Sequence, residues 1–281
     1  MSTIDSDADA HTGGHPVGYT GIDDLLVTLD KGVLGVTFNR PDSLNSLTAP
    51  MLNTFAATLE RAAADPGVRV VRVGGSGRGF SSGAGISAAD HANPDAAGTP
   101  ADVLDAANRS IRAIVNLPQP VVAVVQGAAA GVGASLALAC DVVLASEKAF
   151  FMLAFTKIGL MPDGGASALI AAAVGRIRAM RMALLAERIS AADAHGWGLV
   201  SAVYPVDEFD VEVATVIATL VSGPAIALRK TKDAINAATL TELEGALERE
   251  AQGQSVLLGT RDFREGTKAF QQRRSANFAD S

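Results

Sequence analysis

Short hydrophobic runs alternate with polar turns and with longer stretches of helical periodicity. Leu25–Leu29 and Val33–Phe38 are joined by Asp30-Lys31-Gly32, a pattern that predicts a β-hairpin. Further apolar runs, each bounded by turn residues, predict buried strands at Val68–Val73, Val121–Val125, Val142–Ala145 and Ala149–Leu153.

The stretches between these runs are typical of helices. Thr48 can cap a helix that runs to about Ala64, and a second helix covers Ala101–Asn116. From Ala166 onward the pattern is mostly helical, and capping boxes are predicted at Ser190–Asp193 and Thr241–Glu244. Strands that alternate with helices, followed by helices alone, predict an α/β protein with a helical C-terminal part.

We expect three regions along the chain. Residues 1–19 are acidic with little hydrophobic periodicity, which predicts a disordered tail. Residues 20–205 form the α/β core, and residues 206–281 form the helical C-terminal region. Residues 87–100 are expected to be a flexible connection.

Composition narrows the class of protein. Hydrophobic residues make up 48% of the 281 residues and aromatic residues only 5%, so the core is built mainly from Ala, Val and Leu. The net charge of −7 argues against nonspecific nucleic-acid binding, which needs a cationic surface. The single cysteine and the lack of a leader-like or membrane-spanning run predict a cytosolic protein.

Two of the predicted strands are each followed by a glycine-rich segment, Gly74–Gly85 and Gly127–Gly133. Glycine lets backbone N–H groups come close to a ligand, and two such groups on one oxygen would make an oxyanion hole. Spacing alone leaves two alternatives open. The segments can be ordinary turns, or the second can bind the dinucleotide of an NAD(P)-dependent oxidoreductase, although Leu136 stands at the third position of that fingerprint.

Several ordered motifs resemble the enoyl-CoA hydratase/isomerase (crotonase) superfamily. They lie in one register between about Leu25 and Phe278, at Leu44–Leu47, Gly77–Ile86, Pro120–Asp141, Phe155–Gly165 and Glu265–Phe270. The resemblance implies a spiral of β-β-α units with a helical C-terminal trimerisation region, and a homotrimer or hexamer. It implies an acyl-CoA thioester as substrate, with no separate cofactor and no metal.

The resemblance also assigns roles to residues. The oxyanion donors fall on the backbone N–H groups of Ala84 and Val132, which would hold the thioester oxygen as it becomes an enolate. The remaining substrate-binding positions that it implies are Leu44, Asn45, Ser46, Leu47, Gly85, Ile86, Gly131, Ser135, Phe155, Lys268 and Arg274. Of these, Lys268 and Arg274 are the expected phosphate partners, supplied by the same or a neighbouring subunit.

The chain departs from the hydratases of this family, which use two glutamates to activate water. Ser135 and Phe155 stand at those positions, and neither side chain can replace a carboxylate as general base. Asp163 instead matches the aspartate of the ring-epoxide isomerases of phenylacetate breakdown, the branch that the surrounding motif resembles most. We therefore expect an isomerase with Asp163 as proton shuttle.

Two alternatives remain for these residues. Asp163 precedes Gly164 and a predicted helix, so it can be a simple N-cap, and the chain can be a crotonase homologue that binds acyl-CoA without turnover. A helix N-terminus would lower the pKa of Asp163, whereas an apolar pocket would raise it. Cys140 is expected to be a packing residue, and His195 has no second ligand at metal spacing.

Overall fold

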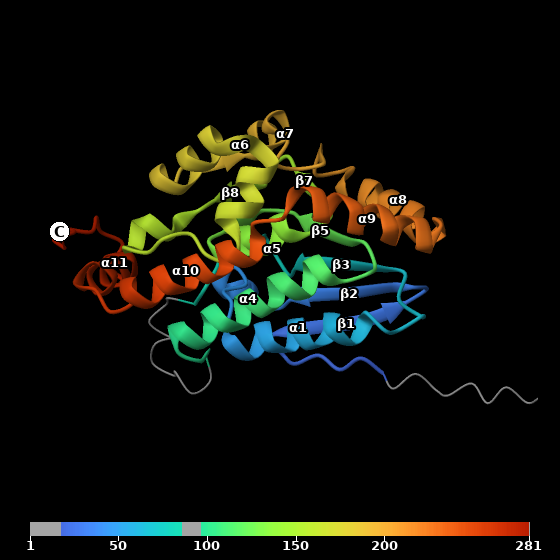
Figure 1. Ribbon diagram of the computed structural model, residues 1–281, viewed down its shortest axis with the longest axis horizontal. Helices are drawn as coiled ribbons and strands as arrows, with labels where there is room; N and C mark the ends of the chain where they lie inside the picture. Colours follow the sequence, from blue (N-terminus) through green and yellow to red (C-terminus); the bar gives the residue numbers. More distant parts are fainter. Residues whose placement is uncertain (1–17, 86–96, 281) are drawn as a thin grey trace, which may run out of the picture.

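The computed structural model describes residues 18–85 and 97–280 (Figure 1). Most of the predicted tail and of the predicted connection at 87–100 lies outside this range. At the start of the described chain, the Tyr19 hydroxyl donates to Asp65 Oδ2 over 2.9 Å, and the Arg61 guanidinium lies 4.4 Å from the Tyr19 ring centroid. Tyr19 is thus held against the folded core.

Two sheets make up the centre of the molecule. The larger sheet has the strand order β1-β2-β3-β5-β7-β10, with strands at Leu25–Asp30, Val33–Phe38, Val70–Gly75, Val121–Val125, Val142–Ser146 and Ala202–Tyr204. The smaller sheet has the order β4-β6-β8-β9, with strands at Gly79–Ser81, Ala128–Ala130, Phe150–Met152 and Ile189–Ser190. All pairings are parallel except β1–β2 and β8–β9.

Successive strands pass from the large sheet to the small one and are then followed by a helix. This happens three times, in β3-β4-α4, β5-β6-α5 and β7-β8-α6, so each repeat adds one strand to each sheet. The predicted spiral of β-β-α units is confirmed. The strands β4 and β6 were not predicted from the sequence, because they are three residues long and lie inside the segments predicted as glycine loops.

The helices cover both sheets. Helices α1 and α4 pack side by side, and α8 contacts β3 and β7 on the large sheet (Figure 1). The α-helices are α1 (Ala49–Ala62), α4 (Pro100–Asn116), α5 (Val132–Ala139), α6 (Ala166–Leu185), α7 (Ala191–Trp197), α8 (Phe209–Ser222), α9 (Ala225–Thr239), α10 (Leu243–Leu257) and α11 (Arg261–Gln271). Within the described ranges no single helix is long and apolar enough to cross a bilayer, and α8 and α9 reach that length only together, across a 105° bend.

The predicted helix caps have different outcomes. Thr48 accepts from Met51 N over 3.4 Å, so that cap is confirmed. Ser190 accepts from Asp193 N over 3.1 Å and is the N-cap of α7, but the predicted box is only half formed, because Asp193 Oδ2 accepts from the Ser190 hydroxyl and not from its backbone N–H. The capping box at Thr241 is wrong, because α10 begins at Leu243 and the Glu244 carboxylate accepts instead from the Arg112 side chain on α4.

Candidate active site

A largely apolar cavity of about 540 Å³ opens between the small sheet and the C-terminal helices. Its walls come from the 43–47 loop, the two glycine segments, the 3-10 helix η2 (Ala154–Ile158), α10 and α11. Ala84, Val132, Phe155 and Asp163, which lie far apart in the sequence, all line this one cavity.

The two glycine segments meet at the cavity wall. Gly83 has a φ of +91°, and a Cβ there would lie 2.8 Å from the Ala130 carbonyl oxygen and 3.4 Å from the Val132 nitrogen. A side chain at Gly83 would therefore be strained by its backbone angle and would also push the two segments apart. Glycine at position 83 therefore lets the backbone N–H groups of Ala84 and Val132, one in each segment, lie next to the same cavity.

The backbone N–H groups of Ala84 and Val132 have no hydrogen-bond partner in the described part of the chain. Around Ala84, Leu47 N donates to Gly83 O over 2.8 Å and Gly85 N donates to Leu47 O over 3.0 Å, so the Ala84 N–H lies on the other side of the segment from Leu47. Val132 is the first residue of α5, where an N–H has no partner within the helix. Neither donor is used by the sheet.

Asp163 is a buried residue, 6% exposed, and the two oxygens of its carboxylate differ in their hydrogen bonding. Oδ2 accepts a hydrogen bond of 2.6 Å from Gln254 Nε2, whereas Oδ1 has no partner among the described residues. Burial is the main cause that raises the pKa of Asp163 to about 7; the Gln254 hydrogen bond opposes it and the charge of Glu250 adds to it. Half of such groups are ionised near neutral pH, which suits a proton shuttle.

Asp163 does not cap the helix that follows it, so that alternative is wrong. Helix α6 begins after Gly165, and its first N–H groups are bound by Glu250 from α10: Oε2 accepts from Gly165 N over 2.7 Å and Oε1 from Ser167 N over 2.9 Å. Because Glu250 supplies the negative charge at the helix N-terminus, the Asp163 side chain remains available to the cavity.

Gln254 fixes the orientation of the Asp163 carboxylate. Its Oε1 accepts from Met161 N over 3.3 Å, which leaves Nε2 to face Asp163. Glu250 and Gln254 lie one turn apart on α10 and are both buried, and neither was predicted from the sequence.

Comparison with known proteins identifies the family. The family model described as enoyl-CoA hydratase/isomerase matches residues 28–281. The chain belongs to the enoyl-CoA hydratase/isomerase family. This crotonase-type membership confirms the predicted recognition and overturns the alternative of an NAD(P)-dependent oxidoreductase.

The relatives of this chain include proteins named as isomerases and proteins named as hydratases. The 1,2-epoxyphenylacetyl-CoA isomerase of Escherichia coli K12 is 37% identical over 259 residues, 90% of this chain and 97% of the relative. A probable enoyl-CoA hydratase of Rhodobacter capsulatus is 39% identical over 89% of this chain and 95% of the relative. The crystal structure of an enoyl-CoA hydratase from Mycobacterium avium subsp. paratuberculosis K-10 is 66% identical, with a TM-score of 0.86 over 92% of this chain and 100% of that chain.

The positions of the two hydratase glutamates hold no acid in this family member. The Ser135 hydroxyl donates to the Asp163 backbone oxygen over 2.8 Å and does not line the cavity. The Phe155 ring lines the cavity close to Gly131. Asp163 is thus the one described carboxylate among the residues that line the cavity.

The other predicted substrate-binding positions fall into different places. Leu44, Ser46, Leu47, Gly85 and Gly131 line the cavity. Asn45 does not: it is fully buried, accepts from Arg40 N and donates to the carbonyls of Ser76 and Gly79, so it holds the loop in shape. Ile86 lies outside the described residues.

Lys268 and Arg274 lie on α11 and just beyond it, and neither lines the cavity of this chain. Lys268 is exposed. Arg274 donates to both carboxylate oxygens of Glu265, over 2.5 and 2.9 Å. Their role as phosphate partners stays a prediction.

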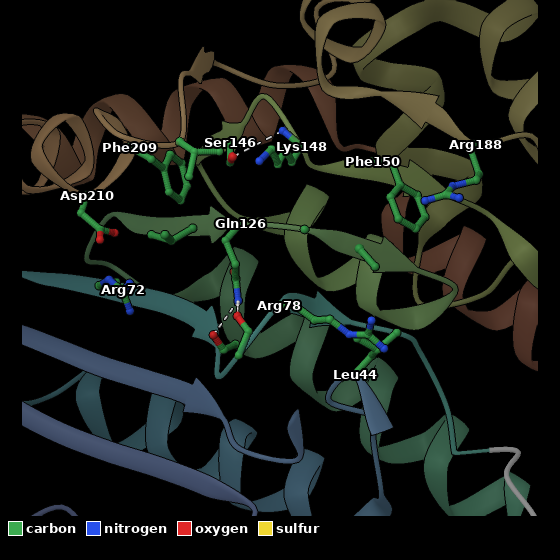
Figure 2. Close-up of a pocket in the computed structure, with 16 residues that line it drawn as sticks. Leu44, Arg72, Arg78, Gln126, Ser146, Lys148, Phe150, Arg188, Phe209 and Asp210 are labelled. Atoms are coloured by element: carbon green, nitrogen blue, oxygen red, sulfur yellow. Dashed lines mark hydrogen bonds between the residues drawn. The ribbon is translucent and has the colours of Figure 1, made fainter. Parts of the chain in front are cut away.

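A second cleft, of about 710 Å³, adjoins the cavity (Figure 2). The two share Leu44, Ala128 and Phe150 in their walls. Four cationic side chains line this cleft: Arg72, Arg78, Lys148 and Arg188.

Other candidate groups have structural roles. Cys140 is buried, its thiol donates to the Leu136 oxygen over 3.3 Å, and burial raises its pKa well above the ordinary range, as expected for a packing residue. Within the described ranges no group of three His, Cys, Asp or Glu side chains could hold a metal ion.

Proposed function

We propose that this protein is an acyl-CoA isomerase, of the double-bond or ring-isomerase type, in which Asp163 shuttles the proton. The observation that carries the proposal is that only one of the two carboxylate oxygens of Asp163 is hydrogen-bonded among the described residues. Gln254 binds Oδ2, while the buried Oδ1 has no partner among the described residues and belongs to a side chain that lines the cavity. A buried carboxylate oxygen without a hydrogen bond is costly, and substrate contact would explain its retention.

The reaction needs no added reactant. With the thioester oxygen at the Ala84 and Val132 N–H groups, Asp163 Oδ1 takes a proton from a carbon near the carbonyl. The electron pair of that C–H bond moves into the thioester as an enolate, whose O⁻ the two amides stabilise. Asp163, which can exchange this proton with solvent, then returns a proton to a different carbon, so the double bond has moved and the base is regenerated.

Hydration is the less favoured chemistry. It would need a second acid–base group to activate and hold water, and the two positions that carry glutamates in hydratases are a serine and a phenylalanine in this chain. The relatives' names divide between isomerase and hydratase, so the preference for isomerase rests on the side chains of this cavity. The trimer or hexamer and the cytosolic location expected from the sequence remain predictions.

The test is the isosteric variant Asp163→Asn, assayed with an enoyl-CoA ester. Because the amide cannot accept the proton, kcat should fall by about a thousandfold or more, while the Kd for the ester stays close to that of the parent. The matched control is Asp193→Asn, which alters a surface carboxylate at the start of α7. Turnover by Asp163→Asn at the parent rate would reject the role. Binding of the ester without any turnover by the parent would instead support the non-catalytic alternative.

A further inference from the structure

Asp163 lies in a turn that the backbone alone does not hold. The next two residues, Gly164 and Gly165, have φ values of +66° and +74°, in the left-handed region that glycine adopts without strain. Among the described residues, the backbone supplies the Asp163 carbonyl oxygen with one long hydrogen bond, of 3.4 Å from Ala166 N. Two adjacent glycines give the chain many alternative conformations, so side chains have to select the one that this turn adopts.

Ser135 holds this turn from α5. Its side chain is fully buried, and its Oγ donates to the Asp163 carbonyl oxygen over 2.8 Å. A Cβ at Gly164 would lie 3.1 Å from the Ser135 Cβ, so the turn packs directly on this serine. Ser135 also follows Val132, the first residue of α5, by three positions. One turn of a single helix therefore connects the Val132 N–H to the segment that carries Asp163.

Glu250 holds the same turn from α10. The residue is 1% exposed, and its carboxylate accepts from Gly165 N over 2.7 Å, from Ser167 N over 2.9 Å and from Ser167 Oγ over 2.5 Å. All three partners are donors, so they favour the ionised carboxylate, although burial raises its pKa. Neither Glu250 nor Ser135 lines the cavity. Both therefore act on a substrate in the cavity only through the turn that they hold.

We propose that Ser135 and Glu250 are positioning residues that hold this turn between α5 and α10. They fix the Asp163 carboxylate relative to the Val132 N–H, and thus the base relative to the oxyanion hole. The inference rests on the proposed function for the role of Asp163 as the base. It gives Ser135, at a position where hydratases of this family carry a glutamate, the task of placing the base. Placement matters because proton transfer is fast only within hydrogen-bond reach of the reacting carbon.

The first test removes the Ser135 hydroxyl and compares the effect with that of a matched serine. Ser110 on α4 is also fully buried and donates to the Leu52 oxygen on α1, over 3.1 Å, but it does not line the cavity. With an enoyl-CoA ester, Ser135→Ala should lower kcat about tenfold or more and change KM by less than about twofold. Ser110→Ala should keep both constants at a similar loss of Tm. Parent-like kcat in Ser135→Ala, or equal losses of kcat in the two variants, would overturn the proposal.

The second test removes the charge of Glu250. The charge of Glu250 acts on Asp163, and that of Arg249 acts on Glu250. Glu250→Gln should lower the plateau of kcat at high pH about tenfold, because the new NH₂ group cannot accept from a backbone N–H. It should also move the midpoint of the kcat profile to lower pH, because loss of the negative charge favours ionised Asp163. Glu244→Gln, a surface carboxylate of α10 bound by Arg112, is the control. An unmoved midpoint would overturn the role of Glu250.

A measurement without turnover separates this proposal from the proposed function. Hydrogen–deuterium exchange of residues 163–169, followed by mass spectrometry on the full chain, reports how firmly the turn is held. Ser135→Ala and Glu250→Gln should exchange about tenfold faster there than the parent, whereas Ser110→Ala and Glu244→Gln should not. Parent-like exchange in the first two variants would overturn the proposal even if the parent is an active isomerase. Faster exchange in those two variants alone would support it even if no isomerase activity is found.

Discussion

Gln254 on α10 donates a 2.6 Å hydrogen bond to the carboxylate of Asp163, across 91 residues of sequence. The amide is oriented by Met161 N, and the bond leaves the second carboxylate oxygen of Asp163 without a described partner. If Asp163 is the proton shuttle, the C-terminal helices do more than close the cavity. In that case Gln254 on α10 sets which oxygen of Asp163 meets the substrate and, by its hydrogen bond, how readily Asp163 takes a proton.

Replacing Gln254 with leucine should change the pH dependence of turnover. The hydrogen bond lowers the pKa of Asp163, so its loss should move the pKa above about 7. The rate depends on the ionised base, which gains population as pH rises, so the midpoint of the kcat profile should shift to higher pH. We expect kcat at pH 7 to fall about tenfold. Gln252→Leu, an exposed position on the same helix, is the control. An unshifted profile for Gln254→Leu would contradict the positioning role.

The spacing of the two amides can be tested at Gly83. In Gly83→Ala, the new Cβ would meet the Ala130 oxygen and the Val132 nitrogen, which should separate the oxyanion donors and lower kcat by about a hundredfold. Gly175 also has a positive φ, of +75°, but a Cβ there meets nothing within 4 Å. Gly175→Ala should therefore carry similar backbone strain and keep its kcat. A folded Gly83→Ala protein with parent activity would count against the oxyanion assignment.

The burial of Asp163 should appear in the pH dependence of stability. Its pKa is about 7 in the folded protein and near 3.8 when exposed, so the folded state holds the proton more tightly. That contribution to stability is complete below about pH 4 and is lost as pH rises toward about 7. Asp163→Asn has no such loss, so its Tm should exceed that of the parent by several degrees at about pH 8, and the difference should shrink toward about pH 4. A Tm difference between Asp163→Asn and the parent that does not change with pH would show that ionisation of Asp163 does not destabilise the folded protein.

An ion pair outside the site, in which Lys232 is buried and Asp141 is partly exposed, should affect stability but not activity. Lys232 Nζ lies 2.8 Å from Asp141 Oδ2, which also accepts from Val121 N. Lys232→Met leaves the Asp141 charge without its partner and should lower the free energy of unfolding by about 3 kcal/mol, measured by urea denaturation. The surface pair of Arg109 and Glu60 offers the control, because Arg109→Met should cost less than about 1 kcal/mol. Equal losses of unfolding free energy in the two variants would show that the burial of Lys232 does not strengthen its ion pair.

Local pattern predicted most elements but not the polar network of the site. Apolar runs predicted the hairpin and strands β3, β5, β7 and β8, because these are continuous signals within a few residues. The resemblance predicted roles for Asp163 and for the two amides, which lie in continuous motifs and line one cavity. Glu250 and Gln254 carry no such signal, since their partners lie 85 and 91 residues away.

Contacts with residues distant in the sequence also determined which side chains cap the helices. Thr241 and Glu244 have the spacing of a capping box, but Arg112 of another helix takes the Glu244 carboxylate. Asp163 has the position of an N-cap, but Glu250 takes the N–H groups of α6. The cationic cleft likewise gathers residues from β3, the turn before β4, the β7–β8 turn and the segment before β9, which no single motif contains.

Proton transfer to solvent tests the role of Asp163 most directly. An enoyl-CoA ester incubated in D₂O with the parent protein should gain deuterium at the α or γ carbon, followed by NMR or mass spectrometry, as Asp163 exchanges the proton it has taken. With Asp163→Asn, bound equally well, no deuterium should enter. Exchange by Asp163→Asn at the parent rate would contradict that role, because another group would then have to remove the proton.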